Sequence, residues 1–250
     1  MTDPSLREWL SEGPFGLAMS AGFFGFYAHA GAFVALEDAG LLPDRASGSS
    51  AGALVAGAWA SGLDAAAFAG ELAALRREHF WDPAPGFGLL RGRLFLERLR
   101  AMLPAQTFAA CRIPLAVSAF DVYARRVRSL SAGDLPRAVV ASCALPGLFH
   151  PVWIDGRPHV DGGVTDRAGL AGMPAGGRVL FHHLSSRSPW RRRGSPAISV
   201  PERGGLRAVV VEGVPRVGPF RLEVGPRAFE AARRGMQRAL ASRADSVIAA

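Results

Sequence analysis

A serine flanked by glycines is the clearest chemical signal in this chain. The run Gly48-Ser49-Ser50-Ala51-Gly52 has the pattern G-x-S-x-G. Between a strand and a helix, such a run holds its middle serine at the tip of a tight turn, where the hydroxyl can act as a nucleophile. The positive end of the following helix favours an alkoxide and an oxyanion formed beside it. Ser50 is therefore predicted to be a nucleophile, the alternative being a serine in an ordinary turn.

A nucleophilic serine needs a base, and Asp161 is the candidate. The run Asp161-Gly162-Gly163 follows a short extended segment that ends at Val160. Two glycines let the backbone approach another loop closely and leave the carboxylate free to point sideways. Asp161 would take the Ser50 proton as acyl transfer begins and return it to the leaving group, which requires a dry site that raises its pKa. Taken alone, Asp161 also fits a plain Asp-Gly turn.

Histidines near the end of the sheet offer a second arrangement. The order Ser50, Asp161 and then His182 or His183 matches a Ser-Asp-His triad, in which His182 would be the base and Asp161 its orienting partner. These histidines lie inside an apolar run rather than on an evident loop, so we favour a structural role for them. We also interpret His29, inside a predicted helix, as a packing or capping residue.

Several runs taken together resemble the patatin-like phospholipase family. They are Gly-Ser-Ser-Ala-Gly-Ala at 48–53, Ala-Ser-Cys-Ala-Leu-Pro-Gly-Leu-Phe at 141–149 with Pro151, Asp-Gly-Arg at 155–157 and Asp-Gly-Gly-Val at 161–164. Their order and spacing resemble the family over about residues 16 to 185. The resemblance implies a three-layer α/β/α fold with a central, mostly parallel sheet. It also implies hydrolysis of lipid acyl esters such as phospholipids, with Ser50 as nucleophile, Asp161 as its sole partner, and no metal or cofactor.

The loop after the first predicted strand departs from the family pattern. The family usually reads G-G-G-x-R-G there, whereas residues 21–26 read Ala-Gly-Phe-Phe-Gly-Phe. Backbone N–H groups can still form an oxyanion hole if the turn keeps its geometry. We assign this role to Gly22, Phe23 and Ala51, and expect Phe23 and Phe24 to replace glycines only at negative φ. The altered loop motivates an alternative, a catalytically impaired protein that binds lipid or a partner without turnover.

The elements that must position these residues begin as a βαβα pattern, which implies a parallel sheet with helices on both faces. The expected strands or extended runs are 16–20, 113–121, 125–130, 153–154, 159–160 and 179–182. The expected helices are 27–39 closed by Gly40, 53–60, 65–77 after the cap Asp64, 93–102, 134–141 with Asp134 as cap, and an amphipathic 227–241. We expect one domain over 1–250, with a core at about 16–185 and a C-terminal extension, 186–250, holding a strand and a helix.

Composition excludes several other functions. The formal charge is +8, and every one of the 29 basic residues is Arg. Without Lys there is no P-loop lysine, Schiff base or Ser-Lys dyad. Because Ala, Gly and Pro are also abundant, we interpret the arginine excess as compositional bias and expect no nucleic-acid partner. Cys111 and Cys143 lack metal-ligand spacing, and residues 1–12 lack the apolar core of a secretory signal, so a cytoplasmic protein without zinc or disulfides is expected.

Three segments bear on lipid contact. Residues 17–36 are nearly all apolar, but their glycines favour a strand, a loop and a buried helix over a membrane span. The loop 185–193, rich in Arg with Trp190, suits anionic lipid headgroups, although a solvated loop is the simpler interpretation. The aromatic loop with Phe80, Trp81 and Phe87, followed by Leu89 and Leu90, would line or cover an acyl groove, or pack a core. We expect an acyl-ester lipid as partner and peripheral contact with an anionic membrane.

Overall fold

The computed structural model describes residues 3–185 and 199–250. The α-helices are α1 (Leu6–Ser11), α2 (Phe26–Asp38), α3 (Ala51–Ala60), α4 (Ala65–Ala73), α5 (Arg93–Met102), α6 (Leu135–Cys143) and α7 (Gly225–Ala241). The strands are β1 (Gly16–Met19), β2 (Arg45–Ser49), β3 (Gly88–Leu90), β4 (Leu115–Asp121), β5 (Arg126–Leu130), β6 (Gly147–Phe149), β7 (Val152–Ile154), β8 (Arg157–Asp161), β9 (Val179–His183), β10 (Leu206–Val210) and β11 (Val247–Ala249).

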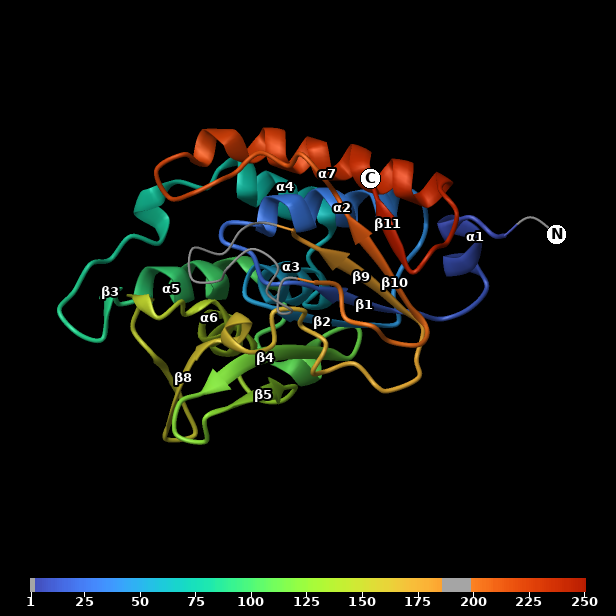
Figure 1. The fold of residues 1–250 in the computed structure, drawn as a ribbon. Coiled ribbons are helices and arrows are strands. Elements are labelled where there is room, and N and C mark those ends of the chain that lie inside the picture. The colour runs from blue at the N-terminus through green and yellow to red at the C-terminus, as the bar shows by residue number, and fades with distance from the viewer. Residues whose placement is uncertain (1–2, 186–198) are drawn as a thin grey trace.

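A mostly parallel sheet forms the centre of the molecule (Figure 1). Its strand order is β11-β10-β9-β1-β2-β4-β8-β7, and β5 pairs with β4 outside this path. All strands from β11 to β4 run parallel, whereas β4 pairs antiparallel with both β5 and β8. The prediction of an α/β fold with a central, mostly parallel sheet is confirmed.

Strands β1 and β9, in the middle of the parallel part, are buried on both faces, which is why each reads as a short, mainly apolar run. Side chains alternate between the faces, so Leu17 and Met19 join the main core with the helices, whereas Ala18 packs on the other side with Phe181 and Met173. Among the described residues, that second face is covered by connecting segments rather than helices. The covering residues are Ala168, Leu170, Met173 and Val200.

The C-terminal residues extend the same sheet. They contribute two strands, β10 and β11, where one was expected, and β10 pairs with β9. Helix α7 lies alongside α2 in Figure 1. The two helices approach closely, since a Cβ at Gly31 would collide with the backbone of Phe229. This contact packs α7 against α2, the helix that follows the loop after β1.

Capping residues read from the sequence predicted the starts of two helices correctly. Asp64 and Asp134 cap α4 and α6 by accepting hydrogen bonds from Ala67 and Arg137 N–H groups. The prediction for 65–77 was wrong at its end, because α4 stops at Ala73 and the following residues turn inward to wall a cavity. Residues 17–36 form β1, a loop and most of α2. In the described ranges, none of the helices has the length and apolarity that crossing a bilayer requires.

Candidate active site

Ser50 occupies a strained turn between β2 and α3. Its backbone has φ 53° and ψ −118°, a conformation that costs a non-glycine residue about 1–3 kcal/mol. The flanking glycines make the turn sterically feasible. A Cβ at Gly48 would collide with the backbone of Gly52, and one at Gly52 would collide with the backbone of Met19. Only a sequence with glycine at both positions allows α3 to start this close to the sheet.

Strand register brings Asp161 to Ser50. On one side of β4, Ser49 at the end of β2 pairs with Ser118, and Asp161 at the end of β8 pairs with Ala119. Because β8 runs antiparallel to β4 and β2 runs parallel to it, the C-terminal ends of β2 and β8 meet head-on. The Ser50 hydroxyl donates a hydrogen bond to Asp161 Oδ2 at 2.7 Å. Two groups that lie 111 residues apart are thereby joined.

The Asp161 carboxyl is held in a sheltered place. Its Oδ1 accepts a hydrogen bond of 2.7 Å from the Gly163 N–H, and only 5% of the residue is exposed. Burial raises the pKa of Asp161 to about 6, although the hydrogen bonds from Ser50 and Gly163 and the charge of Arg167 oppose that rise. A carboxylate with this pKa is a stronger base than one in water and is still ionised at neutral pH.

Sequence reasoning missed the groups that hold the Ser50 backbone. The Ser50 N–H donates to Ser142 Oγ at 2.9 Å, and that hydroxyl donates to the Ser118 carbonyl at 2.6 Å. The Cys143 thiol donates to the Ser50 carbonyl at 3.2 Å, and burial raises the pKa of this thiol so that it stays neutral. Both residues lie in the run 141–149, but their role depends on contacts across the sheet that no local pattern encodes.

A cavity of about 820 Å³ opens above the pair. Its wall is mainly aromatic and aliphatic, with side chains from α3, α4, α5 and the segment 145–149. These include Leu54, Phe68, Leu72, Phe80, Phe95, Leu99, Met102, Leu145 and Phe149. The five predicted site residues Ser50, Asp161, Gly22, Phe23 and Ala51 all line this cavity. A hollow of about 540 Å³ beside Arg126 and Asp166 contains none of them.

The loop between β1 and α2 has the strain that the sequence interpretation excluded. Phe24 adopts φ 53°, so the expectation of a negative φ at this position was wrong, whereas Phe23 avoids positive φ. Ring contacts hold Phe24 there, with centroids 5.0 Å from Phe23 and 5.8 Å from Phe80. In the part of the chain that the structure describes, the N–H groups of Gly22 and Phe23 have no hydrogen-bond acceptor. They are thus available to a ligand in the cavity.

The histidines form a separate buried pair. His182 Nδ1 lies 2.8 Å from His29 Nδ1, and His29 Nε2 lies 2.8 Å from the Ser20 carbonyl. Since that carbonyl can only accept, His29 carries its proton on Nε2 and accepts a hydrogen bond from His182. Burial lowers the pKa of His29 to about 4 and that of His182 well below its usual value, so both are neutral. His182 bonds to neither Ser50 nor Asp161, so it does not act as the base of a triad.

The remaining sequence hypotheses divide among the described regions. Phe80 lines the cavity, whereas Trp81, Phe87 and Leu89 lie outside its wall, and Leu90 is buried. The basic loop lies outside the described residues, apart from Ser185. Across residues 3–185 and 199–250, no three His, Cys, Asp or Glu side chains gather as metal ligands would.

The geometry agrees with what sequence comparison finds. Residues 17–172 match the sequence profile described as patatin-like phospholipase. The chain belongs to the patatin-like phospholipase family. An uncharacterized NTE family protein of Mycobacterium tuberculosis is 34% identical over 165 residues, which cover 64% of this chain and 46% of that protein. Lysophospholipase nte1 of Emericella nidulans is 28% identical over 174 residues, 66% of this chain and 11% of that protein.

Similarity to a solved structure extends over most of the chain. VipD from Legionella pneumophila superposes with a TM-score of 0.55 at 15% identity, and the match covers 92% of this chain and 67% of that one. This likeness shows a shared fold. The chain spans less than half the length of the mycobacterial relatives that it matches.

Proposed function

We propose that this protein is a serine hydrolase of lipid acyl esters that uses Ser50 and Asp161 as a dyad. The observation that carries the proposal is the 2.7 Å hydrogen bond from Ser50 Oγ to the buried Asp161 carboxylate, at the wall of an apolar cavity. Membership of the patatin-like phospholipase family supports a phospholipid or similar acyl ester as substrate. The size and apolar lining of the cavity suit an acyl chain.

The reaction proceeds through an acyl-enzyme. Asp161 accepts the hydroxyl proton as Ser50 Oγ bonds to the ester carbonyl carbon, and the N–H groups of Gly22, Phe23 and Ala51 stabilise the negative oxygen that results. The ester C–O bond then breaks, and Asp161 gives the proton to the departing alcohol. Water attacks the acyl carbon while Asp161 takes its proton, and release of the fatty acid returns that proton to Ser50.

Labelling with a fluorophosphonate probe tests this assignment, because such probes react with activated serines. We expect the purified wild-type protein to be labelled and Ser50→Ala to be unlabelled. Ser49→Ala is the matched control. Ser49 is adjacent to Ser50 and buried, and its hydroxyl has no hydrogen-bond partner among the described residues, so this variant should label as the wild type does. Labelling that persists in Ser50→Ala would place the nucleophile elsewhere.

A second candidate is a lipid-binding protein that does not turn lipid over. The left-handed backbone at Phe24, within the loop that departs from the glycine-rich pattern of the family, is the observation that favours it. Two results together would support this candidate over the hydrolase. The folded wild-type protein would take no label, and it would bind a fluorescent fatty acid that the Leu54→Phe variant no longer binds. Leu54 lines the cavity, so the larger side chain would occupy the space of the ligand.

A further inference from the structure

One end of the molecule carries an exposed surface that combines aromatic and aliphatic side chains with arginines. We call it the tip patch and define it as Trp81, Phe87, Leu89, Phe220, Arg77, Arg91 and Arg221. Phe87 is 90% exposed, Phe220 67% and Leu89 49%. Large apolar side chains at such exposure are unusual when they gather together, and they mark surfaces that meet another apolar phase or a partner.

Ring contacts join the two chain segments that build the tip patch. The guanidinium of Arg77 lies 5.7 Å from the Trp81 ring and 5.1 Å from the Phe220 ring. The Trp81 and Phe220 centroids are 5.4 Å apart. These cation–π and edge contacts fix residues 77–81 against residue 220, although the two segments are far apart in the sequence.

The loop that carries Phe87 and Leu89 is held in shape by its own hydrogen bonds. Asp82 accepts hydrogen bonds from the N–H groups of Gly92, Arg93 and Leu94, at the start of α5. Strand β3 pairs with β6, with Leu90 opposite Phe149. The exposed side chains are therefore presented by a preorganised loop, which lowers the entropic cost of inserting them into a second phase.

The tip patch backs directly onto the cavity wall. Phe80, the neighbour of Trp81, lines the cavity, as does Phe149 on the strand that pairs with β3. Figure 1 shows the arrows of β4 and β9 pointing toward the end of the molecule where β3 lies, which is the end that holds Ser50. A lipid leaving a surface that contacts the tip patch has a short path to the nucleophile.

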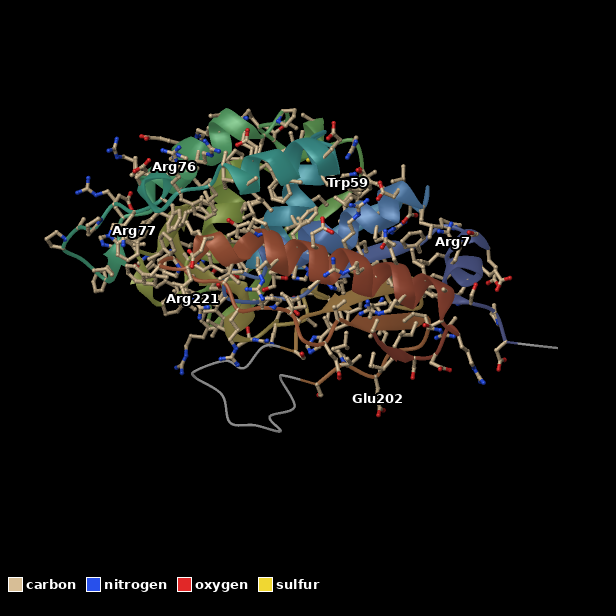
Figure 2. The ribbon with its side chains drawn as sticks, turned by 90° about the horizontal axis from the view of Figure 1, so that it is seen from above. Arg7, Trp59, Arg76, Arg77, Glu202 and Arg221 are labelled. Carbon is tan, nitrogen blue, oxygen red and sulfur yellow. The ribbon has the colours of Figure 1, made fainter. Side chains whose placement is uncertain are left out.

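The arginines of the tip patch indicate which kind of surface it would contact. Figure 2 labels Arg76, Arg77 and Arg221 at this end and Arg7 at the opposite one. Within the described ranges, no carboxylate lies in ion-pair distance of Arg77, Arg91 or Arg221, whereas Arg76 has Glu78 at 3.6 Å. Arginines beside exposed aromatic side chains match the interface of a bilayer with anionic headgroups, where rings enter the acyl boundary and guanidinium groups meet phosphates.

We infer that the tip patch docks this protein on an anionic lipid bilayer, with Phe87 and Leu89 entering the interface and Arg91 and Arg221 contacting headgroups. The delivery of lipid to Ser50 rests on the proposed function, whereas the docking itself does not. Free phosphate is a poorer occupant, since it would leave the exposed Phe87 and Leu89 in water.

Co-sedimentation with vesicles tests the docking. The Ser50→Ala background prevents hydrolysis, and the vesicles contain either phosphatidylcholine alone or equal parts phosphatidylcholine and phosphatidylglycerol. We expect binding to the mixed vesicles that weakens with salt. Phe87→Ala with Leu89→Ala should reduce the partition coefficient at least about tenfold through lost apolar burial. Arg91→Gln with Arg221→Gln should reduce it about tenfold or more on the mixed vesicles only.

Matched controls lie at the other end of the parallel strands. Leu42 is 56% exposed in the loop before β2, so Leu42→Ala should leave vesicle binding unchanged, as should Arg7→Gln. No sedimentation with mixed vesicles, or equal losses in patch and control variants, would overturn the inference. Fluorophosphonate labelling of the wild-type protein, which keeps Ser50, separates the two proposals. If the wild type takes no label but the protein binds vesicles, the hydrolase is refuted and the docking is not. If the wild type is labelled but the protein does not bind vesicles, the docking is refuted and the hydrolase is not.

Discussion

At the scale of single residues, burial of one carboxyl sets the pH at which this site can work. Asp161 must be ionised to accept the Ser50 proton, and burial raises its pKa to about 6. We predict that the rate of fluorophosphonate labelling increases with pH and reaches half its plateau near pH 6, because Asp161 loses its proton over this range and only the ionised carboxylate can accept the Ser50 proton. Labelling rates measured from about pH 5 to about pH 8 check this. A rate that follows a group near pH 4 would mean that Asp161 is not the base.

The same carboxyl should weaken the folded state above neutral pH. Its folded pKa of about 6 exceeds the ordinary value of 3.8, so its contribution to stability is complete below about pH 3.8 and is lost as pH rises through about 6. The resulting cost at pH 8 is about 2–3 kcal/mol. We predict that Asp161→Asn unfolds at higher urea concentration than the wild type at pH 8, and that the two midpoints converge near pH 4. An Asn variant that is less stable at every pH would show that the carboxylate is stabilised by its partners.

At the scale of elements, Gly52 should be irreplaceable and Gly70 dispensable. Both lie in helices, but a Cβ at Gly52 would collide with the backbone of Met19, whereas a Cβ at Gly70 meets nothing within 4 Å. We predict that Gly52→Ala lowers the free energy of unfolding by about 1–3 kcal/mol and slows labelling of Ser50. Gly70→Ala should raise it by about 0.5–1 kcal/mol and leave labelling unchanged. Urea denaturation and labelling rates of both variants provide the comparison. Equal effects would mean that the turn tolerates a side chain.

The elements also show how far local patterns reach. The Ser50 turn, the helix caps Asp64 and Asp134, and the bounds of α5 were predicted because each depends on neighbours in the sequence. The meeting of β2 and β8 depends on register along β4, which no local signal encodes. Positive φ at Phe24 was missed for the same reason, because rings from distant segments compensate its strain.

At the scale of the whole molecule, the residues after 199 are built into the structure that holds the site. Strand β10 pairs with β9, and α7 packs on α2, which begins directly after the loop that lines the cavity. Unfolding of the C-terminal part therefore removes the support of the candidate oxyanion loop. We therefore propose that residues 1–250 unfold as one cooperative domain, in which the sheet, the helices and the site lose their structure together.

We predict a single calorimetric unfolding transition that coincides with the loss of labelling competence. Gly31→Ala should lower the midpoint of that transition, because its Cβ would force α2 away from the Phe229 backbone. We expect this overpacking to lower the free energy of unfolding by about 1–3 kcal/mol. In a chain of this size, each kcal/mol lost lowers the midpoint by roughly 2–4 °C. Gly13→Ala, whose Cβ has no neighbour within 4 Å, is the matched control and should not lower the midpoint. Two transitions, with labelling that survives the first, would show instead that the C-terminal part folds independently and that the site does not need α7.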